Sequence, residues 1–320
     1  ARLPDGSRVN AVVRPVAIDG PSITIRKFRK DKLQVEELIN FGSMTRQMAD
    51  FLQACVKARF NIVISGGTGS GKTTLLNVMS GFIPENERII TIEDVRELNL
   101  PEYMKWNWVP LTTRNPNPEG SGEVTMLDLL LSSLRMRPDR LILGEMRTQK
   151  EAETLFEAMH TGHSVYATIH ADSARQVLRR LIEAPISVPA LEVEAVDMIL
   201  VQYRDRKNNV RKSYELAEIE SGITGEQVGI NDIFRWSARD DSWEKVAEPV
   251  RLMQKLNLHT GMTQHEVESE VLDRIRILEW MVRHEFGNID QVGQLMRAFY
   301  ANPEKVKQAA ERDDKPGDVL

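Results

Sequence analysis

The chain has 320 residues and a formal net charge of −5, with 41% hydrophobic and 28% charged residues. This balance is typical of a soluble globular protein, so disorder is not expected, and the length allows two or three domains. The sequence contains neither a run of about eighteen apolar residues nor a signal-peptide pattern, so we expect a cytoplasmic protein without a membrane span. Its single cysteine, Cys55, excludes an internal disulfide and is expected to lie buried in a helix.

The first thirty residues contain two strand-like segments, 8–13 and 22–28, and an excess of basic side chains. We expect 1–30 to be the remnant of an N-terminal domain and 31–44 to be a linker. The opening at Ala1 indicates a fragment or a processed chain. The basic excess favours either an anionic partner or a solvated surface. The basic residues are Arg2, Arg8, Arg14, Arg26, Lys27, Arg29 and Lys30.

Residues 45–220 alternate between helical patterns and short apolar runs. The helical spacing of Met48, Leu52 and Cys55 predicts a first helix over 45–58. The apolar runs, separated by further helical patterns, predict a mostly parallel sheet covered on both faces, which is an α/β three-layer fold. Capping boxes at Thr125 and Thr148 indicate helix starts. The predicted strands are Asn61–Ser65, Arg88–Ile92, Arg140–Gly144, Ser164–His170 and Met198–Tyr203.

The segment 221–320 is expected to form a mainly helical C-terminal region. Thr263 and Glu266 make another capping box, and a second helix is expected to stop at Asn302-Pro303. Apolar stripes at helical spacing are more often core than partner surface, so we expect both stripes to be buried. The two stripes are Val267, Val271, Ile275, Leu278 and Val282, and then Val292, Leu295, Met296 and Phe299.

The strongest chemical signal is the glycine-rich segment Gly66–Thr73, which lies directly between a predicted strand and a predicted helix. In such a loop the backbone N–H groups curl around a phosphate, and the helix N-terminus adds positive potential. Lys72 is expected to reach the β- and γ-oxygens, and Thr73 to bind Mg²⁺. The segment therefore predicts a Mg²⁺-dependent NTPase. The expected nucleotide-binding residues are Gly67, Thr68, Gly69, Ser70, Gly71, Lys72, Thr73 and Thr74.

Hydrolysis also needs acidic groups that hold the metal and orient water. Glu93 follows one predicted strand, and Glu145 ends another in the manner of a Walker B strand. Gly144 stands where many such strands carry a metal-binding Asp. We therefore expect Glu145 to polarise the attacking water, and Glu93 to support the metal together with Thr73. The alternative is that these carboxylates cap neighbouring helices.

Three histidines, His160, His163 and His170, fall close together and raise the possibility of a metal site. At the end of a strand, however, Thr168 and His170 project to one side. This placement favours a γ-phosphate sensor at His170. A histidine satisfied within the core is the other interpretation.

Four boxes in this order and spacing resemble the nucleotide site of the type II/type IV secretion ATPase superfamily, the motors of secretion systems, type IV and Tad pili and the archaeal flagellum. The resemblance extends over nearly the whole chain, and His160-Thr-Gly-His163 and the helical tail look closest to the archaeal branch. A tetracysteine zinc module is excluded by the single cysteine. The boxes are Gly66–Thr73, Thr91–Asp94, Leu143–Arg147 and Ala167–Asp172.

The resemblance implies a RecA-like P-loop ATPase domain at 45–220, with a partial α+β N-terminal domain and a helical C-terminal extension. It implies a homo-hexamer that hydrolyses ATP with Mg²⁺, with Glu145, Glu93 and His170 in the catalytic site. Arg26 is the first candidate for an arginine finger, ahead of Arg135 and Arg147.

The same resemblance implies work on the inner face of the cytoplasmic membrane, where an integral membrane platform protein of a secretion or pilus system is the expected partner. Two other functions are considered. A RecA-like DNA motor is disfavoured because the acidic chain lacks a basic groove with interleaved aromatic residues, so no nucleic acid is expected. A nucleotide-gated scaffold with little turnover is the second.

Overall fold

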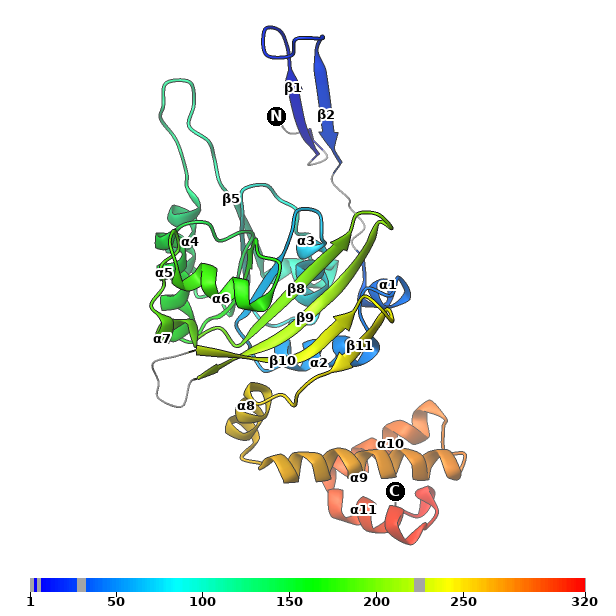
Figure 1. Ribbon diagram of the computed structural model, residues 1–320. Coiled ribbons are helices and arrows are strands. Elements are labelled where there is room, and N and C mark those ends of the chain that lie inside the picture. The colour runs from blue at the N-terminus through cyan, green and yellow to red at the C-terminus, as the bar shows by residue number, and fades with distance from the viewer. Residues whose placement is uncertain (1–2, 5–6, 28–32, 222–227, 320) are drawn as a thin grey trace. The chain divides into compact units, whose positions relative to one another are not determined.

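The computed structural model describes residues 3–4, 7–27, 33–221 and 228–319. The chain divides into two compact units, Ala1–Leu252 and Met253–Leu320, which we call the core unit and the helical unit (Figure 1).

The described residues of the core unit form a nine-stranded sheet of order β11-β10-β9-β8-β3-β7-β6-β4-β5. The strands from β8 to β5 pair in parallel, whereas β9, β10 and β11 extend the sheet in antiparallel fashion. The predicted parallel sheet is thus confirmed. The strands are β3 (Ile62–Gly66), β4 (Ile89–Glu93), β5 (Trp108–Thr112), β6 (Arg140–Leu143), β7 (Ser164–Ile169), β8 (Met198–Asp205), β9 (Val210–Ser221), β10 (Val228–Ser237) and β11 (Ser242–Lys245).

Helices cover both faces of this sheet, which confirms the three-layer α/β fold. Helices α4 to α7 lie on one face, where their apolar side chains join one core with Val63, Leu141 and Ile199 of the strands. On the other face α2 packs against α3, which contacts β3 and β7. The helices are α1 (Val35–Asn40), α2 (Arg46–Lys57), α3 (Lys72–Ser80), α4 (Met126–Ser133), α5 (Gln149–His160), α6 (Ala174–Ile182) and α7 (Ala190–Val193), with 3-10 turns at Glu102–Asn107 and Leu134–Met136.

Local sequence signals explain several of these boundaries. Thr125 and Thr148 form the predicted capping boxes, in which each side chain accepts a hydrogen bond from the third residue of the helix that follows. Cys55 is buried in α2, as expected. The central strand β3 is buried along its whole length, which accounts for its continuous apolar run.

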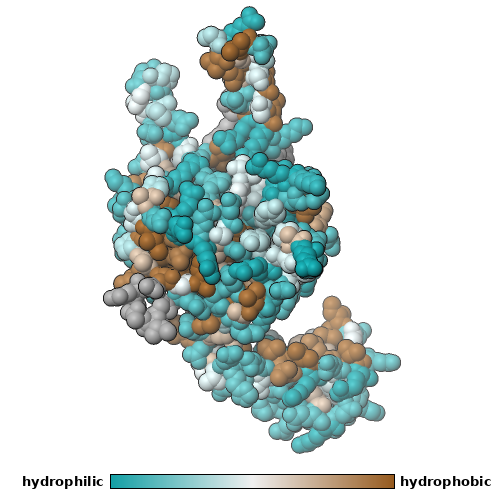
Figure 2. Space-filling view, in the orientation of Figure 1, coloured by the Kyte–Doolittle hydropathy of each residue, from teal (hydrophilic) through white to brown (hydrophobic). Residues whose placement is uncertain are grey.

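The N-terminal strands β1 (Arg8–Val12) and β2 (Ser22–Arg26) pair as an antiparallel hairpin that carries exposed apolar side chains (Figure 2). Part of the expected linker, residues 28–32, lies outside the described residues. Helix α1 lies inside the range assigned to that linker.

The expected boundary at residue 220 does not coincide with the division at Leu252. The reason is that β10 and β11 hydrogen-bond onto the sheet beyond β9. The helices that follow are α8 (Arg251–Thr260), α9 (Gln264–Arg283), α10 (Ile289–Ala301) and α11 (Pro303–Arg312), with a 3-10 turn at Pro316–Val319. Among the described residues, no helix combines the length and apolar character needed to cross a bilayer.

The core of the helical unit uses a different face of α9 from the one predicted. Ile277, Trp280 and Met281 are buried, together with Leu295 and Phe299 of α10. The second predicted stripe is therefore confirmed as core. The expectation for the first stripe is wrong, because Val271, Ile275, Leu278 and Val282 are exposed, and their side chains contribute to the apolar surface of this unit (Figure 2).

Arg140 is a fully buried cation at the start of β6. Its guanidinium is ion-paired with Glu87 and donates hydrogen bonds to Ser164 Oγ (2.9 Å) and Tyr166 Oη (3.0 Å). The buried hydroxyl of Tyr166 has its pKa raised to about 12, chiefly by burial. The site is thus a closed polar network at the edge of the sheet where the parallel strands begin.

We predict that Arg140→Met lowers the free energy of unfolding by about 3 to 5 kcal/mol, because it removes one member of a buried ionic network. Urea denaturation measures this loss. Arg179→Ala, which removes an exposed ion pair with Glu183, should change stability by less than about 1 kcal/mol. Equal effects of the two substitutions would contradict the structural role given to Arg140.

Candidate active site

The glycine-rich loop joins β3 to α3 at the edge of the sheet where the parallel strands end. Gly66 has φ +138°, and a Cβ on it would lie 2.2 Å from the carbonyl oxygen of Gln202 in β8. Gly71, with φ +105°, is the N-cap of α3. Only glycine fits both positions, so the sequence permits a tight loop that aims a helix N-terminus into the cavity beside it.

Lys72 lies over this loop. Its Nζ donates hydrogen bonds to the carbonyl oxygens of Gly66 (2.7 Å) and Gly67 (3.1 Å). Burial lowers the pKa of Lys72, while the neighbouring carboxylates of Glu145 and Asp172 oppose that shift. The ammonium is therefore held where its charge is poorly solvated, as expected of a group that binds a multiply charged anion.

His170 connects this lysine to the predicted catalytic carboxylate. Lys72 Nζ lies 3.3 Å from His170 Nδ1, and His170 Nε2 lies 3.3 Å from Glu145 Oε1. An ammonium can only donate, so Nδ1 must accept and the ring proton must lie on Nε2. His170 is therefore assigned as a neutral imidazole that accepts from Lys72 and donates to Glu145.

Arg147 holds the other side of the same carboxylate. Its Nη2 lies 2.6 Å from Glu145 Oε2, and its Nη1 is ion-paired with Asp94. The pKa of Arg147 is raised, mainly by the hydrogen bond to Glu145. A continuous series of polar contacts thus runs from Asp94 through Arg147, Glu145 and His170 to Lys72.

Glu93 lies at the end of β4 and is only 4% exposed. Its Oε1 accepts hydrogen bonds from the backbone N–H groups of Glu97 (2.9 Å) and Leu98 (3.1 Å). Burial raises the pKa of Glu93 to about 7, although these two hydrogen bonds oppose the shift. A Cβ on Gly144 would lie 3.4 Å from Glu93 Cγ, so Glu93 lies next to Gly144. Gly144 is the position at which many Walker B strands carry a metal-binding Asp.

The predicted residues gather around one cavity of about 1090 Å³. Its lining includes Thr68–Thr74, Glu93, Glu145, His170 and Arg26. Gly67 does not line the cavity and contributes its carbonyl to Lys72 instead. Arg26 lies at the same cavity and is ion-paired with Glu97 at 2.9 Å, whereas Arg135 does not line it.

Sequence reasoning missed Arg211, whose Nε donates to the carbonyl oxygen of Gly69 at 3.0 Å. No local motif marks this residue, because only the antiparallel pairing of β9 with β8 brings it to the phosphate loop. Of the three histidines, only His170 lines the cavity; the Nδ1 of His163 lies 3.1 Å from the carbonyl oxygen of Ala158.

The donor chemistry fits a magnesium nucleotide. Thr73 and Glu93 supply the hydroxyl and carboxylate oxygens that a hard cation prefers. The hydroxyl of Ser70 is buried and has no hydrogen-bond partner among the described residues, so the loop retains an unsatisfied donor. No group of three or more His, Cys, Asp or Glu residues in the described ranges is arranged to hold a metal by itself.

The raised pKa of Glu93 predicts a pH-dependent contribution to stability. Because the folded pKa of about 7 exceeds the usual value of 4.5, this contribution is fully present below pH 4.5 and is lost as the pH rises to about 7. We expect wild type to lose about 3 kcal/mol relative to Glu93→Gln over this range. Urea denaturation of both proteins at several pH values measures the difference, and a constant difference would contradict the assignment.

Comparisons with known proteins support the same fold and family. Over 306 residues the chain is 36% identical to MJ0900 of Methanocaldococcus jannaschii, which covers 93% of this chain and 54% of that protein. Over 203 residues it is 39% identical to the type IV secretion system protein PtlH of Bordetella pertussis, which covers 57% of this chain and 59% of PtlH. The chain thus spans little more than half the length of these relatives.

The structure of the ATPase DotB from Legionella pneumophila covers 69% of this chain and 59% of DotB, at 19% identity and a TM-score of 0.51, and so supports the fold alone. The resemblance inferred from the four boxes is confirmed, and the relatives from Methanocaldococcus are consistent with the archaeal branch. The model of the type II/IV secretion system protein family matches residues 1–278, and the chain therefore belongs to that family.

Proposed function

We propose that this chain is the ATPase motor of a type IV secretion or pilus-like system, and that it hydrolyses ATP with Mg²⁺ at the Lys72 site. The observation that carries the proposal is the continuous contact from Lys72 through His170 to Glu145. This contact connects the loop expected to bind phosphate with the carboxylate expected to orient water. A loop that only bound nucleotide would not require it.

In this proposal the arriving phosphate replaces the carbonyl oxygens of Gly66 and Gly67 as the partner of Lys72. The backbone N–H groups of the loop and the N-terminus of α3 stabilise the same negative charge. When Lys72 turns to the phosphate, His170 Nδ1 loses its hydrogen-bond donor. The hydrogen bonds of His170 can then depend on whether the γ-phosphate is present. Glu145 is positioned to accept a hydrogen bond from the attacking water.

Mg²⁺, when bound, would neutralise charge on the β- and γ-phosphates. Thr73 and Glu93 are the residues proposed to hold it. Burial raises the pKa of Glu93 to about 7, and a nearby cation would favour the ionised form. The proximity of Glu93 to Gly144 supports its use in place of the missing Asp.

Arg26 is proposed as the arginine finger, because it lines the cavity and its partner Glu97 belongs to the segment that follows Glu93. The homo-hexamer, the membrane platform partner and the location on the inner face of the cytoplasmic membrane rest on family membership. Measurements of ATP hydrolysis do not depend on these three features. Light scattering with and without nucleotide tests the hexamer directly.

We predict that Lys72→Ala and Glu145→Gln each lower steady-state phosphate release from ATP at least about 100-fold. Glu145→Gln should retain nucleotide affinity, because the ion pairs of Glu145 are made with His170 and Arg147, which lie outside the phosphate loop. Lys72→Ala should lose affinity as well. If slow turnover persists unchanged in Glu145→Gln, a nucleotide-gated scaffold replaces the motor as the better interpretation.

Substitutions at His170 test the assigned hydrogen-bond directions. Gln also offers one acceptor and one donor, so His170→Gln should keep kcat within about 10-fold of wild type. His170→Ala removes both ends and should lower kcat by about 100-fold. The comparison is made by phosphate release at saturating ATP. Equal losses in the two variants would show that the relay through His170 is not needed.

A further inference from the structure

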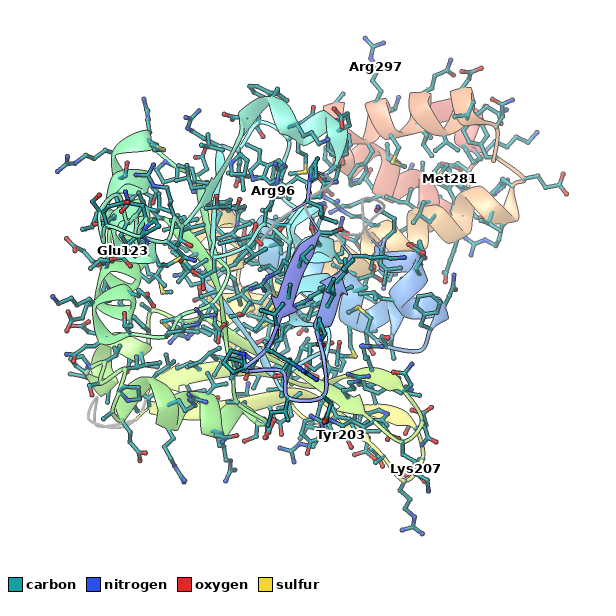
Figure 3. All side chains as sticks on the ribbon, turned by 90° about the horizontal axis from the view of Figure 1, so that it is seen from above. Arg96, Glu123, Tyr203, Lys207, Met281 and Arg297 are labelled. Carbon is teal, nitrogen blue, oxygen red and sulfur yellow. The ribbon has the colours of Figure 1, made fainter. Side chains whose placement is uncertain are left out.

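The phosphate-binding loop has two sides, and the carboxylates occupy only one of them. Strand β3 lies between β7 and β8 in the sheet. His170 follows β7, Glu145 lies two residues after β6, and Glu93 ends β4. On the other side lie the turn between β8 and β9 and the segment after helix α1, which hydrogen-bonds to β9. In Figure 3, Arg96 beyond β4 and Lys207 in the β8–β9 turn are labelled well apart on these two sides.

This arrangement determines the direction of a bound nucleoside triphosphate. The γ-phosphate must face Glu145 and His170, which are the groups that can act on it. The nucleoside must then extend toward β8, β9 and α1. The cavity continues in that direction, where its lining includes Leu38, Phe41, Asn209, Val210 and Arg211.

Phe41 is the one aromatic residue in the described lining of this cavity. It directly follows α1 and is 62% exposed. Leu38 and Met44, which also line the cavity, are apolar and buried. A flat apolar ring exposed beside a phosphate site offers a stacking surface for a planar ligand.

The wall around Phe41 is tied to the phosphate loop. The carbonyl oxygen of Ser43 accepts a hydrogen bond from Ser213 N of β9 at 2.8 Å. Arg211 of the same strand donates to the carbonyl oxygen of Gly69 at 3.0 Å. The segment after Phe41 and the loop that would bind phosphate are therefore connected through one strand, which holds the two subsites at a fixed spacing.

Asn209, in the turn between β8 and β9, provides a polar group to the same cavity lining. Its Oδ1 accepts from Arg204 Nη2 at 3.2 Å, which orients the amide so that its NH₂ is the end available to donate. Ring nitrogens and carbonyl oxygens at the edge of a base accept such a hydrogen bond. A stacking ring and an amide donor are together the chemistry of a base subsite.

We propose that Phe41 and Asn209 form the base subsite of the nucleotide, with a purine stacked on the Phe41 ring. The inference rests on the proposed function and goes beyond it by assigning the residues that bind the base. Stacking increases with the area of the ring system, so purine nucleotides should bind more tightly than pyrimidine nucleotides. Discrimination between adenine and guanine should be weaker, because every purine offers a similar face.

The test compares the dissociation constants of ATP, CTP and inorganic tripolyphosphate by titration calorimetry for wild type and Phe41→Ala. We expect Phe41→Ala to weaken ATP binding about 5- to 100-fold, as loss of one stacked base implies. It should remove the preference of ATP over CTP and leave tripolyphosphate binding unchanged. Phe41→Trp should retain the affinity for ATP. Tyr103→Ala removes an aromatic side chain that is exposed but does not line the cavity, and should have no effect.

Each outcome has one meaning. Unchanged ATP affinity in Phe41→Ala, with tripolyphosphate still bound, overturns the base subsite and leaves the proposed function standing. Equal weakening of ATP and tripolyphosphate also overturns it, because the substitution would then act on the phosphate loop. If wild type binds neither ligand, the proposed function fails and the base subsite fails with it.

Discussion

The parallel alignment of β3, β7, β6 and β4 is the constraint on which the candidate site depends. Because these strands run in the same direction, their carboxyl ends meet at one edge of the sheet. Gly66, His170, Glu145 and Glu93 each lie at such an end or within two residues of it. A slip of one residue in any pairing would move a side chain to the opposite face of the sheet. The hydrogen-bond register of the strands therefore sets which groups can meet.

The two edges of the parallel sheet have different chemistry. At the edge where the strands begin, the charge of Arg140 is fully buried and satisfied by Glu87, Ser164 and Tyr166. At the edge where they end, Glu145, His170 and Arg147 remain partly exposed and share their partners. The first arrangement stabilises the fold, and the second leaves charges within reach of a ligand. Burial thus distinguishes Arg140 from Glu145, His170 and Arg147, whereas Glu93 is the buried carboxylate of the candidate site.

Much of this organisation is visible in the sequence, because parallel strands buried on both faces give continuous apolar runs such as Ile62–Ile64. The capping threonines and the glycine-rich loop depend on residues that are close together in the chain, so they can also be predicted from the sequence. The outer strands were not predicted, since β9 contains the buried charged residues Lys212, Glu215 and Glu218. Glu218 accepts hydrogen bonds from Val250 N and Arg251 N, and no local sequence pattern predicts these partners.

Other features depend on the tertiary structure alone. The stripe on α9 had the right period for a core face, but the neighbouring helices α10 and α11 pack against Trp280 on another side of the helix. Likewise, the sequence identifies Glu93 and Arg147 as polar residues near the site. It does not show that Glu93 receives two backbone hydrogen bonds or that Arg147 bridges two carboxylates.

The hydrogen bonds from Lys72 to the carbonyl oxygens of its own loop have a kinetic consequence. They keep the loop ordered before any ligand arrives, so binding costs little additional backbone entropy. When a phosphate leaves, the ammonium of Lys72 can form these two hydrogen bonds again. In the proposed reaction the same two oxygens would compete with the phosphate product for Lys72, which would shorten the residence time of that product in the loop.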